Sequence, residues 1–292
     1  MIDRFLNYLR YERNASPQTV QTYEESLREF ESYITLRDTG LSLQAVDTDL
    51  IRDWMEELMD KGNSASTINK KLSALRSFYR FSLSRKLVAK DPVHAVVGPK
   101  KSKPLPQFLR EGEMERLLDG LEWGDNYKEV RARTILLLFY ETGMRRSELI
   151  GLDDSDIDFA GKQLKVTGKR NKQRIIPFGE ELSDVLKMFM TVRDEQCDKQ
   201  CDALFLNDKG MRMTGGQVYT IVHQHLTLVT SLKKRSPHVL RHTFATAMLN
   251  NGAGLESIKN LLGHESVSTT EIYAHTTFEQ LKRVYKEAHP RA

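Results

Sequence analysis

The sequence predicts a mainly α-helical protein of two domains with one small antiparallel β-sheet, an α+β fold. Apolar residues recur at helical spacing through most of the 292 residues. Between positions 157 and 178, short β-prone runs alternate with turns, which predicts three antiparallel strands. A segment rich in proline and lysine, 97–106, favours an extended chain. It predicts a linker between a helical N-terminal domain (1–96) and a C-terminal domain (107–292) that holds the sheet.

Turn chemistry divides the first domain into helices. Ser16 followed by Pro17 predicts a helix start, since serine caps helices and proline suits the first helical position. Thr48 precedes a second helical run, and a break at 62–64 precedes a third helix over about 66–85. The apolar stripe of this third helix consists of Ile68, Leu72, Leu75 and Tyr79.

The second domain contains a strongly apolar helix, about 130–140, which is predicted to stop at Gly143 in the left-handed conformation. The sheet follows, with turns at 160–161 and 168–172. Helical patterns then continue to the end, where 276–290 forms a last helix. Its apolar stripe consists of Phe278, Leu281, Val284, Tyr285 and Ala288.

Composition is that of a globular protein with a substantial core, with 39% hydrophobic and 29% charged residues. No stretch approaches 18 apolar residues, and the first residues carry charges throughout, so neither a membrane span nor a secretory signal is predicted. The chain is expected to stay in the cytoplasm. Cys197 and Cys201 fit a reducing compartment and are predicted to be free thiols.

Charge is unevenly distributed along the first domain. Residues 1–60 hold 6 Lys/Arg against 13 Asp/Glu, whereas residues 61–104 hold 11 against one. So dense a basic block indicates a surface for a polyanion. The polar face of the third helix suits the major groove of duplex DNA, although it also fits an ordinary solvated face. The predicted DNA contacts here are Asn69, Lys70, Ser73, Arg76, Ser77 and Arg80 on the helix, and Lys100, Lys101 and Lys103 in the linker.

Two segments of the second domain carry cations at turns. In 142–149, Gly143 lets the chain turn and place Arg145 at a helix N-terminus, where an anion is favoured. Glu148, three residues on, is in reach of Arg145. In 166–174, a hairpin tip carries four cations, Lys169, Arg170, Lys172 and Arg174, which suit either a DNA groove or an ordinary solvated turn. A lysine there also serves as a proton donor if neighbouring cations lower its pKa.

Two further segments add histidines, an arginine and a tyrosine. In 236–243, Ser236 and Pro237 start a helix whose first turns carry His238 and Arg241 on one face, an arrangement that predicts an anion pocket. Downstream, a helix is predicted to end at Gly263, leaving His264 just beyond it. Tyr273 follows nine residues later on a short helix.

Metal and nucleotide chemistry are not predicted. His238 and His242 are four apart, but Val239 occupies the glutamate position of H-E-x-x-H, and Arg241 would repel a cation. No acidic pair suited to Mg²⁺ accompanies these segments, and no G-x-x-x-x-G-K-[ST] loop is present. No metal and no cofactor are therefore expected.

In chain order, Arg145, Lys169, His238, Arg241, His264 and Tyr273 resemble the active site of the tyrosine recombinase/integrase family. The segments T-G-M-R-R-S-E-L, H-V-L-R-H and L-L-G-H, with the tyrosine that follows, are highly specific in combination. The similarity covers essentially the full length and is strongest to the Xer branch.

This resemblance implies a role for each residue. Arg145 and Arg241 would grip the scissile phosphate, with His264 supporting it. His238 would assist proton transfer at Tyr273.

The same resemblance implies that Lys169 protonates the departing 5′ oxygen. The family commonly has glycine after this lysine, whereas Arg170 stands here, which leaves Lys172 as a second candidate for the proton donor.

At the level of the whole protein, the resemblance implies a site-specific recombinase that closes on double-stranded DNA as a C-shaped clamp. It would cut and rejoin the duplex through a 3′-phosphotyrosine intermediate, in chromosome dimer resolution or in mobile-element integration and excision. Four protomers, identical or of two related kinds, would assemble on two DNA sites, with a DNA translocase as a further partner. The last helix, 276–290, would dock on a neighbouring protomer, or else pack on its own domain.

Two other functions are compatible with these residues. A type IB topoisomerase-like enzyme would share the chemistry but rejoin the same strand and relax supercoils. A catalytically silent DNA-binding protein would use the basic surfaces alone.

Overall fold

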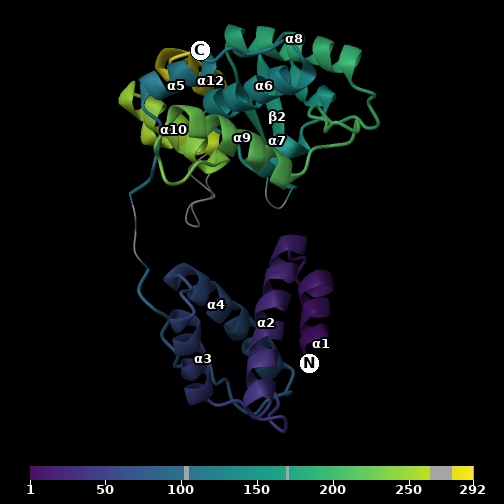
Figure 1. Cartoon of the computed structure of the whole chain (residues 1–292), viewed down its shortest axis with the longest axis vertical. Coiled ribbons are helices and arrows are strands. Elements are labelled where there is room, and N and C mark those ends of the chain that lie inside the picture. The colour runs from purple at the N-terminus through teal and green to yellow at the C-terminus, as the bar shows by residue number, and fades with distance from the viewer. Residues whose placement is uncertain (102–104, 169–170, 264–277, 292) are drawn as a thin grey trace. The chain divides into compact units, whose positions relative to one another are not determined.

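The computed structural model describes residues 1–101, 105–168, 171–263 and 278–291. Contacts divide the chain into two compact units, Met1–Pro104 and Leu105–Ala292. Both units are mainly helical, and the described part of the second also contains a three-stranded antiparallel sheet (Figure 1). The predicted α+β fold class is confirmed.

The first unit is a bundle of helices around an aromatic core. Helix α2 packs against α1 and α4, and α3 also packs against α4. All four residues of the predicted apolar stripe of α4 are buried, and further residues of the helix are buried with them. The helices are α1 (Ile2–Asn7), the π-helical segment η1 (Tyr8–Glu12), α2 (Pro17–Arg37), α3 (Thr48–Asp60) and α4 (Ala65–Ser84).

Helix starts in this unit follow the predicted chemistry with one correction. Ser16 caps α2 and Pro17 is its first residue, as predicted. Thr48, however, was predicted to precede the second helix and is instead the first residue of α3. Asp47 caps this helix by accepting a hydrogen bond of 2.8 Å from the backbone N–H of Leu50. The Thr48 hydroxyl instead donates to the carbonyl of Pro92, 3.0 Å away.

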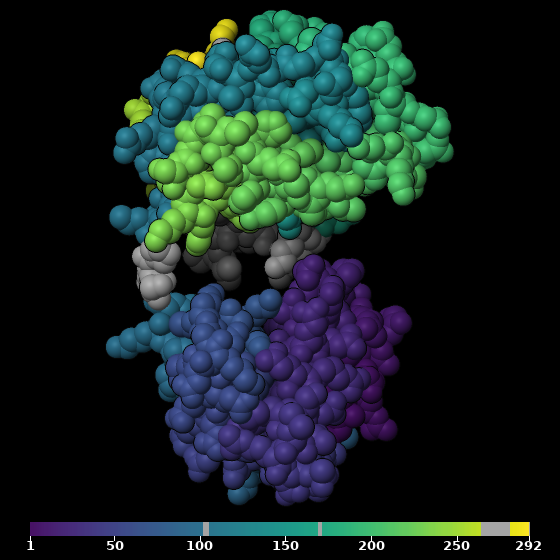
Figure 2. Space-filling model, viewed as in Figure 1, coloured from purple at the N-terminus to yellow at the C-terminus, as the bar shows by residue number. Residues whose placement is uncertain are grey.

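The second unit surrounds one long helix. Helix α6 packs against α5, α8, α9 and α10. The helices of this unit are α5 (Glu111–Leu118), α6 (Tyr127–Thr142), α7 (Arg146–Gly151), the 3-10 turn η2 (Asp154–Asp156), α8 (Glu180–Gln196), α9 (Gly215–Val229), α10 (Pro237–Asn250), α11 (Leu255–Leu262) and α12 (Phe278–Ala288). Space-filling representation shows α9 and α10 forming a continuous surface, green to yellow-green in Figure 2.

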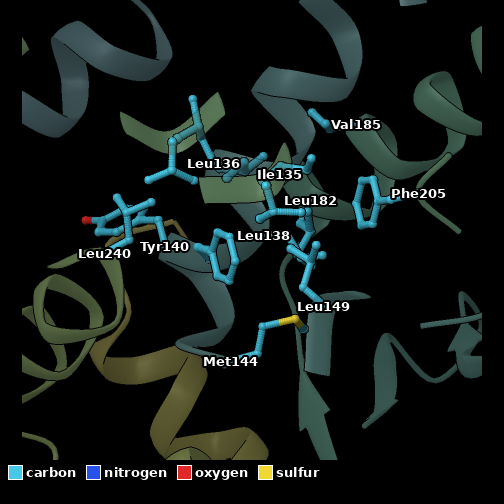
Figure 3. Close-up of a cluster of buried hydrophobic side chains, with 14 of the residues drawn as sticks. Ile135, Leu136, Leu138, Tyr140, Met144, Leu149, Leu182, Val185, Phe205 and Leu240 are labelled. Carbon is cyan, nitrogen blue, oxygen red and sulfur yellow. The ribbon is translucent and has the colours of Figure 1, made fainter. Parts of the chain in front are cut away.

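The core of this unit converges on α6. Side chains from α6, α7, α8 and α10 meet there, including Leu138, Leu149, Leu182 and Leu240, all with no exposed surface (Figure 3). Helix α6 ends at Gly143 with φ at +58°, the predicted left-handed stop.

The predicted three-stranded sheet is confirmed. Its order is β1 (Ile157–Asp158), β2 (Gln163–Thr167) and β3 (Gln173–Pro177), with both pairings antiparallel. The N–H of Gly168 donates to the carbonyl of Lys172 at 2.7 Å, which closes the base of the hairpin between β2 and β3.

In this single chain, the last helix packs on its own unit. Helix α12 contacts α10, α11 and β3, and Tyr285 and Ala288 of the predicted apolar stripe are buried. The Tyr285 hydroxyl donates to the Glu141 carboxyl of α6 at 3.0 Å. None of the helices in the described ranges is both long enough and apolar enough to cross a membrane.

Glu141 is a fully buried carboxyl beneath α12. Burial raises its pKa to about 8, against the opposing effect of hydrogen bonds from the Gly179 N–H and the Tyr285 hydroxyl. His289, just after α12, is also buried, and burial lowers its pKa to about 4. Both groups are therefore neutral near pH 7.

The native protein is expected to lose stability as the pH rises from about 4.5 towards about 8, and Glu141→Gln is expected to abolish this pH dependence. A carboxyl whose pKa is higher in the folded chain than in the unfolded one binds more protons when folded across that window, so the free energy of unfolding falls with pH. The slope is at most about 1.4 kcal/mol per pH unit. The difference between the unfolding midpoints at pH 5.5 and pH 8 should shrink in the variant, while the opposite contribution of His289 is common to both proteins. An unchanged difference would contradict a protonated Glu141.

Candidate active site

Arg145 and Arg241 reach the same place from two different helices. The left-handed turn at Gly143 ends α6, and Arg145 occupies the cap position of α7 two residues later. A side chain at Gly143 would meet the ring of Phe244, since an added Cβ would lie 2.4 Å from it. Both the turn and this close approach therefore require glycine.

The end of α11 is held by three arginines. Each guanidinium donates a hydrogen bond to a different one of three successive backbone carbonyls. These carbonyls are the last that the structure describes before His264. These bonds are Arg174 Nε to Leu261 at 2.9 Å, Arg241 to Leu262 at 2.8 Å and Arg145 to Gly263 at 2.7 Å. Because the C-terminus of a helix carries partial negative charge, it stabilises this concentration of cations.

Within the described part of the chain, the carboxylate of Glu148 lies among these cations. Glu148 of α7 has a side chain with no exposed surface. Its carboxylate accepts hydrogen bonds from Arg145 at 2.8 Å and from Arg174 at 2.6 and 2.9 Å, and it also accepts the backbone N–H of Arg145 at 2.7 Å. Burial favours a raised pKa for Glu148, but the bonds from Arg174 and Arg145 outweigh it and lower the pKa below its usual range. The predicted Arg145–Glu148 pairing is confirmed.

Arg241 is the most enclosed of the three arginines, with 6% of its surface exposed. Besides Leu262, it donates to the carbonyl of Gly143 at 2.6 Å. Burial and the positive charge of Arg145 lower its pKa to about 10, so it remains charged near neutrality. Counted over the described residues, one carboxylate lies with three guanidiniums, and this net positive charge suits a phosphate.

His238 lies one turn before Arg241 on α10. Partial burial, followed by the positive charges of His242, Arg241 and Arg146, lowers its pKa below the ordinary value. A neutral imidazole, able to accept a proton, is therefore favoured near pH 7. Pro237 is the first residue of α10 and Ser236 its cap residue, as predicted, but the Ser236 side chain makes no capping hydrogen bond.

Several predicted site residues lie outside the described residues. They are Lys169 and Arg170 of the hairpin tip, His264 and Tyr273 after α11, and Lys103 of the linker. Their roles stay predictions. The structure does fix what precedes two of them, since Gly168 closes the base of the hairpin and Gly263 ends α11 in the left-handed conformation.

The polar face of α4 has exposed and tethered members. Lys70, Ser73 and Arg80 are exposed, and Ser77 is half-buried, as are the tethered Asn69 and Arg76. Asn69 donates to the carbonyl of Pro99 at 2.8 Å and Arg76 to that of Val96 at 2.7 Å. These two side chains therefore hold the start of the predicted linker on α4, ahead of the exposed Lys100 and Lys101. DNA contact by this face stays a prediction.

The sequence reasoning missed Arg174, which it grouped with the cations of the hairpin tip. Arg174 is two residues from the buried Ile176 on β3, and opposite the buried Val166 on β2. Because side chains two apart on a strand share a face, this alternation would have placed Arg174 on the buried side of the sheet.

A largely enclosed cluster of arginines on one mainly helical unit, and a basic face on the other unit, are typical of an enzyme that acts on a nucleic-acid phosphodiester. Residues 107–280 match the phage integrase family, and residues 2–86 match the SAM-like N-terminal domain of phage integrases. The chain belongs to the phage integrase family of tyrosine recombinases, which cleave and rejoin DNA. The family and enzyme class predicted from the motifs are confirmed.

Full-length relatives confirm the similarity to the Xer branch. The chain is 36% identical over 317 residues to the tyrosine recombinase XerC of Chlorobaculum tepidum, covering 100% of this chain and 94% of that protein. It is 39% identical over 297 residues to XerC of Halalkalibacterium halodurans, covering 100% and 97%. Tyrosine recombinase XerD of Staphylococcus epidermidis is 35% identical over 295 residues, with coverage of 100% and 99%.

Solved structures share the fold. The XerH site-specific recombinase, in a post-cleavage complex with a palindromic difH substrate, has a TM-score of 0.73 at 22% identity, covering 99% of this chain and 82% of that chain. The Tn1549 transposon integrase in complex with transposon right end DNA has a TM-score of 0.72 at 21% identity, covering 98% of each chain.

Proposed function

We propose that this chain is a site-specific recombinase that cuts each DNA strand by attack of the Tyr273 phenol on a phosphodiester. The attack forms a 3′-phosphotyrosine ester and releases a 5′ hydroxyl. The observation that carries the proposal is the cluster of Arg145, Arg241 and Arg174 around the end of α11. It fixes positive charge at the point in the chain directly before the segment 264–273, which carries two further predicted catalytic residues, His264 and Tyr273.

The cluster suits the charge that develops during such an attack. Negative charge grows on the non-bridging oxygens of the phosphate, and cations fixed there in advance stabilise it without reorganisation. Arg145 and Arg241 take this role. Both guanidiniums are already held by backbone carbonyls, and that of Arg145 also by Glu148, so little side-chain freedom is lost when the phosphate binds.

Proton transfer completes the step. A phenol has an ordinary pKa of about 10, so Tyr273 must lose its proton as it attacks. His238, whose pKa is lowered, accepts that proton directly or through water, and His264 supports the phosphate. Lys169 donates a proton to the departing 5′ oxygen, with Lys172 as the second candidate. The phosphotyrosine ester retains the energy of the DNA backbone bond, so neither ATP nor a metal is consumed.

DNA binding uses both units. The exposed cations of α4, the lysines at 100, 101 and 103, and the hairpin tip with Arg170 and Lys172 contact the phosphates of a duplex held in a C-shaped clamp. The high density of cations in 61–104 supports this assignment.

The assembled form is a tetramer of recombinase protomers on two DNA sites. Helix α12 leaves its own unit there and docks on a neighbouring protomer. The XerC and XerD relatives favour chromosome dimer resolution in the cytoplasm, within chromosome partition at cell division. The partner protomers are copies of this chain or a related recombinase, with a DNA translocase as activator.

A nicked suicide-substrate assay tests the function. A nick close to the scissile phosphate lets the released strand end diffuse away, so the protein stays covalently attached to DNA. We expect a covalent adduct with dif-like sites, mapped to Tyr273 by mass spectrometry, and complete loss of the adduct in Tyr273→Phe. Relaxation of supercoils by monomers without site preference would favour the topoisomerase-like reaction instead. DNA binding without any adduct would identify a silent binding protein.

A further inference from the structure

Arg174 is the member of the arginine cluster to which the family resemblance assigns no role. It lies on β3, five residues after Lys169, at the distal end of the hairpin. Its side chain has 15% of its surface exposed. It therefore has little surface with which to contact DNA and must act through its neighbours.

The guanidinium of Arg174 joins three parts of the second unit. Its two terminal nitrogens bind both carboxylate oxygens of Glu148 at 2.6 and 2.9 Å, while its Nε binds the carbonyl of Leu261 at 2.9 Å. One planar group thus ties β3 to the start of α7 and to the end of α11. A lysine offers no fork of this kind, so it cannot reproduce all three contacts.

The base of the hairpin lies against this ion pair. An added Cβ at Gly168 would lie 3.1 Å from a Glu148 carboxylate oxygen and 4.0 Å from an Arg174 terminal nitrogen. Gly168 immediately precedes Lys169 in the chain. The Arg174–Glu148 pair therefore fixes the point from which the tip of the hairpin departs.

Arg145 depends less on Arg174. Its backbone N–H binds Glu148 at 2.7 Å, and its guanidinium binds Glu148 at 2.8 Å and the carbonyl of Gly263 at 2.7 Å. These contacts remain when Arg174 is removed, whereas β3 then loses its bonds to both neighbours. Loss of Arg174 should disturb the hairpin more than the grip on the phosphate.

We propose that Arg174 is a positioning residue that sets the hairpin against α7 and so places the proton donor of the tip beside the departing 5′ oxygen. This inference rests on the proposed function. It predicts a defect specific to one step: release of the 5′ oxygen, which leaves as an alkoxide unless it is protonated. A sulfur at the same position leaves as a thiolate, which needs no proton because the pKa of a thiol is only about 8.5.

The test compares two nicked substrates, one with the natural 5′ oxygen and one with a 5′ bridging sulfur, under single turnover with saturating protein. Arg174→Lys should slow adduct formation on the oxygen substrate by about 30- to 100-fold, and by less than about 3-fold on the sulfur substrate. Lys169→Ala provides the benchmark for loss of the proton donor. Gly168→Ala places a methyl group against the Arg174–Glu148 pair and should therefore give the same selective defect.

Arg193→Lys is the matched control. Arg193 is a buried arginine of α8 that binds both oxygens of Asp154 and the carbonyl of Leu204, the same chemistry away from the cluster. Its loss should lower the thermal midpoint but leave the rates on both substrates unchanged.

Each outcome separates the inference from the function on which it rests. Selective rescue by sulfur in a folded Arg174→Lys protein, or in Gly168→Ala if the first variant unfolds, supports the positioning role. Equal loss on both substrates, in a folded protein that still forms the Tyr273 adduct, overturns it. Failure of the unmodified protein to form any Tyr273-dependent adduct overturns the proposed function and the inference together.

Discussion

Replacing Arg241 with lysine is expected to slow covalent adduct formation by about 10²- to 10³-fold near neutral pH, the range observed when one preorganised donor is removed from a site of developing charge. Arg241 spans two carbonyls from different segments, Gly143 after α6 and Leu262 at the end of α11. A single ammonium cannot span both and also face the phosphate. The carbonyl left without a partner should in addition lower the free energy of unfolding by about 1–3 kcal/mol.

The defect of Arg241→Lys should deepen as the pH rises. Burial and the charge of Arg145 lower the pKa of Arg241 to about 10, which leaves the native guanidinium charged. The same burial and the same neighbouring charge should lower the pKa of an ammonium in this place below its ordinary value of about 10.4. As the pH rises, the variant should therefore lose its charge before the native protein does.

Single-turnover rates of adduct formation between pH 6.5 and 9 measure this effect. The ratio of native to variant rate should rise steadily across that range, and the contribution of His238 should cancel because both proteins contain it. A ratio that stays flat with pH would show that geometry alone, not charge, explains the loss. Arg193→Lys, altered outside the cluster, should keep a ratio near one throughout.

Local patterns were sufficient to predict the parts of the fold that depend on neighbouring residues. The left-handed stop at Gly143 and the stripe of α4 follow from backbone sterics and helical period. The three strands follow from alternation and turns. The family motifs, each carried by a few adjacent residues, were predictable for the same reason.

Contacts between distant segments were not predictable in this way. Thr48 and Asp47 both suit a helix cap, and the carbonyl of Pro92, 44 residues away, engages the Thr48 hydroxyl. In the sequence, Asn69 and Arg76 belong to a polar face that looks open to solvent. In the structure they donate hydrogen bonds to the carbonyls of Pro99 and Val96. The local sequence gives no signal for either set of hydrogen bonds, because each depends on where a distant segment of the chain packs against the helix.

The arginine cluster could not be predicted from the sequence for the same reason. Arg145, Arg174 and Arg241 are spread over almost 100 residues, and the sequence offers no reason to join them to three consecutive carbonyls of α11. Motif resemblance predicted two of the three as phosphate ligands. It did not predict that the third, Arg174, binds the carboxylate of Glu148, which Arg145 also binds.

Glu148→Gln is therefore expected to cost more stability than any surface ion pair, about 3–5 kcal/mol, because it leaves buried guanidiniums without their counter-charge. The amide retains an oxygen for the Arg145 backbone N–H, but its NH₂ group points at cations that also donate. The native protein should show the same loss at acid pH. Since the pKa of Glu148 is lowered in the folded chain, its stabilisation is complete above the unfolded value of about 4.5 and is lost as the pH falls through the folded one.

Calorimetric unfolding of Glu148→Gln, with and without sulfate, measures both the loss and its cause. Sulfate at tens of millimolar should raise the midpoint of the variant more than that of the native protein, because an anion substitutes for the missing carboxylate. Asp154→Asn is the matched control, since Asp154 also binds two cations, Arg193 and Lys199, but outside the cluster. It should lose less stability, because its side chain is 26% exposed, and should form the DNA adduct at the native rate. A Glu148→Gln protein as stable as the native one at pH 7 would mean that the carbonyls of α11 alone neutralise the three arginines.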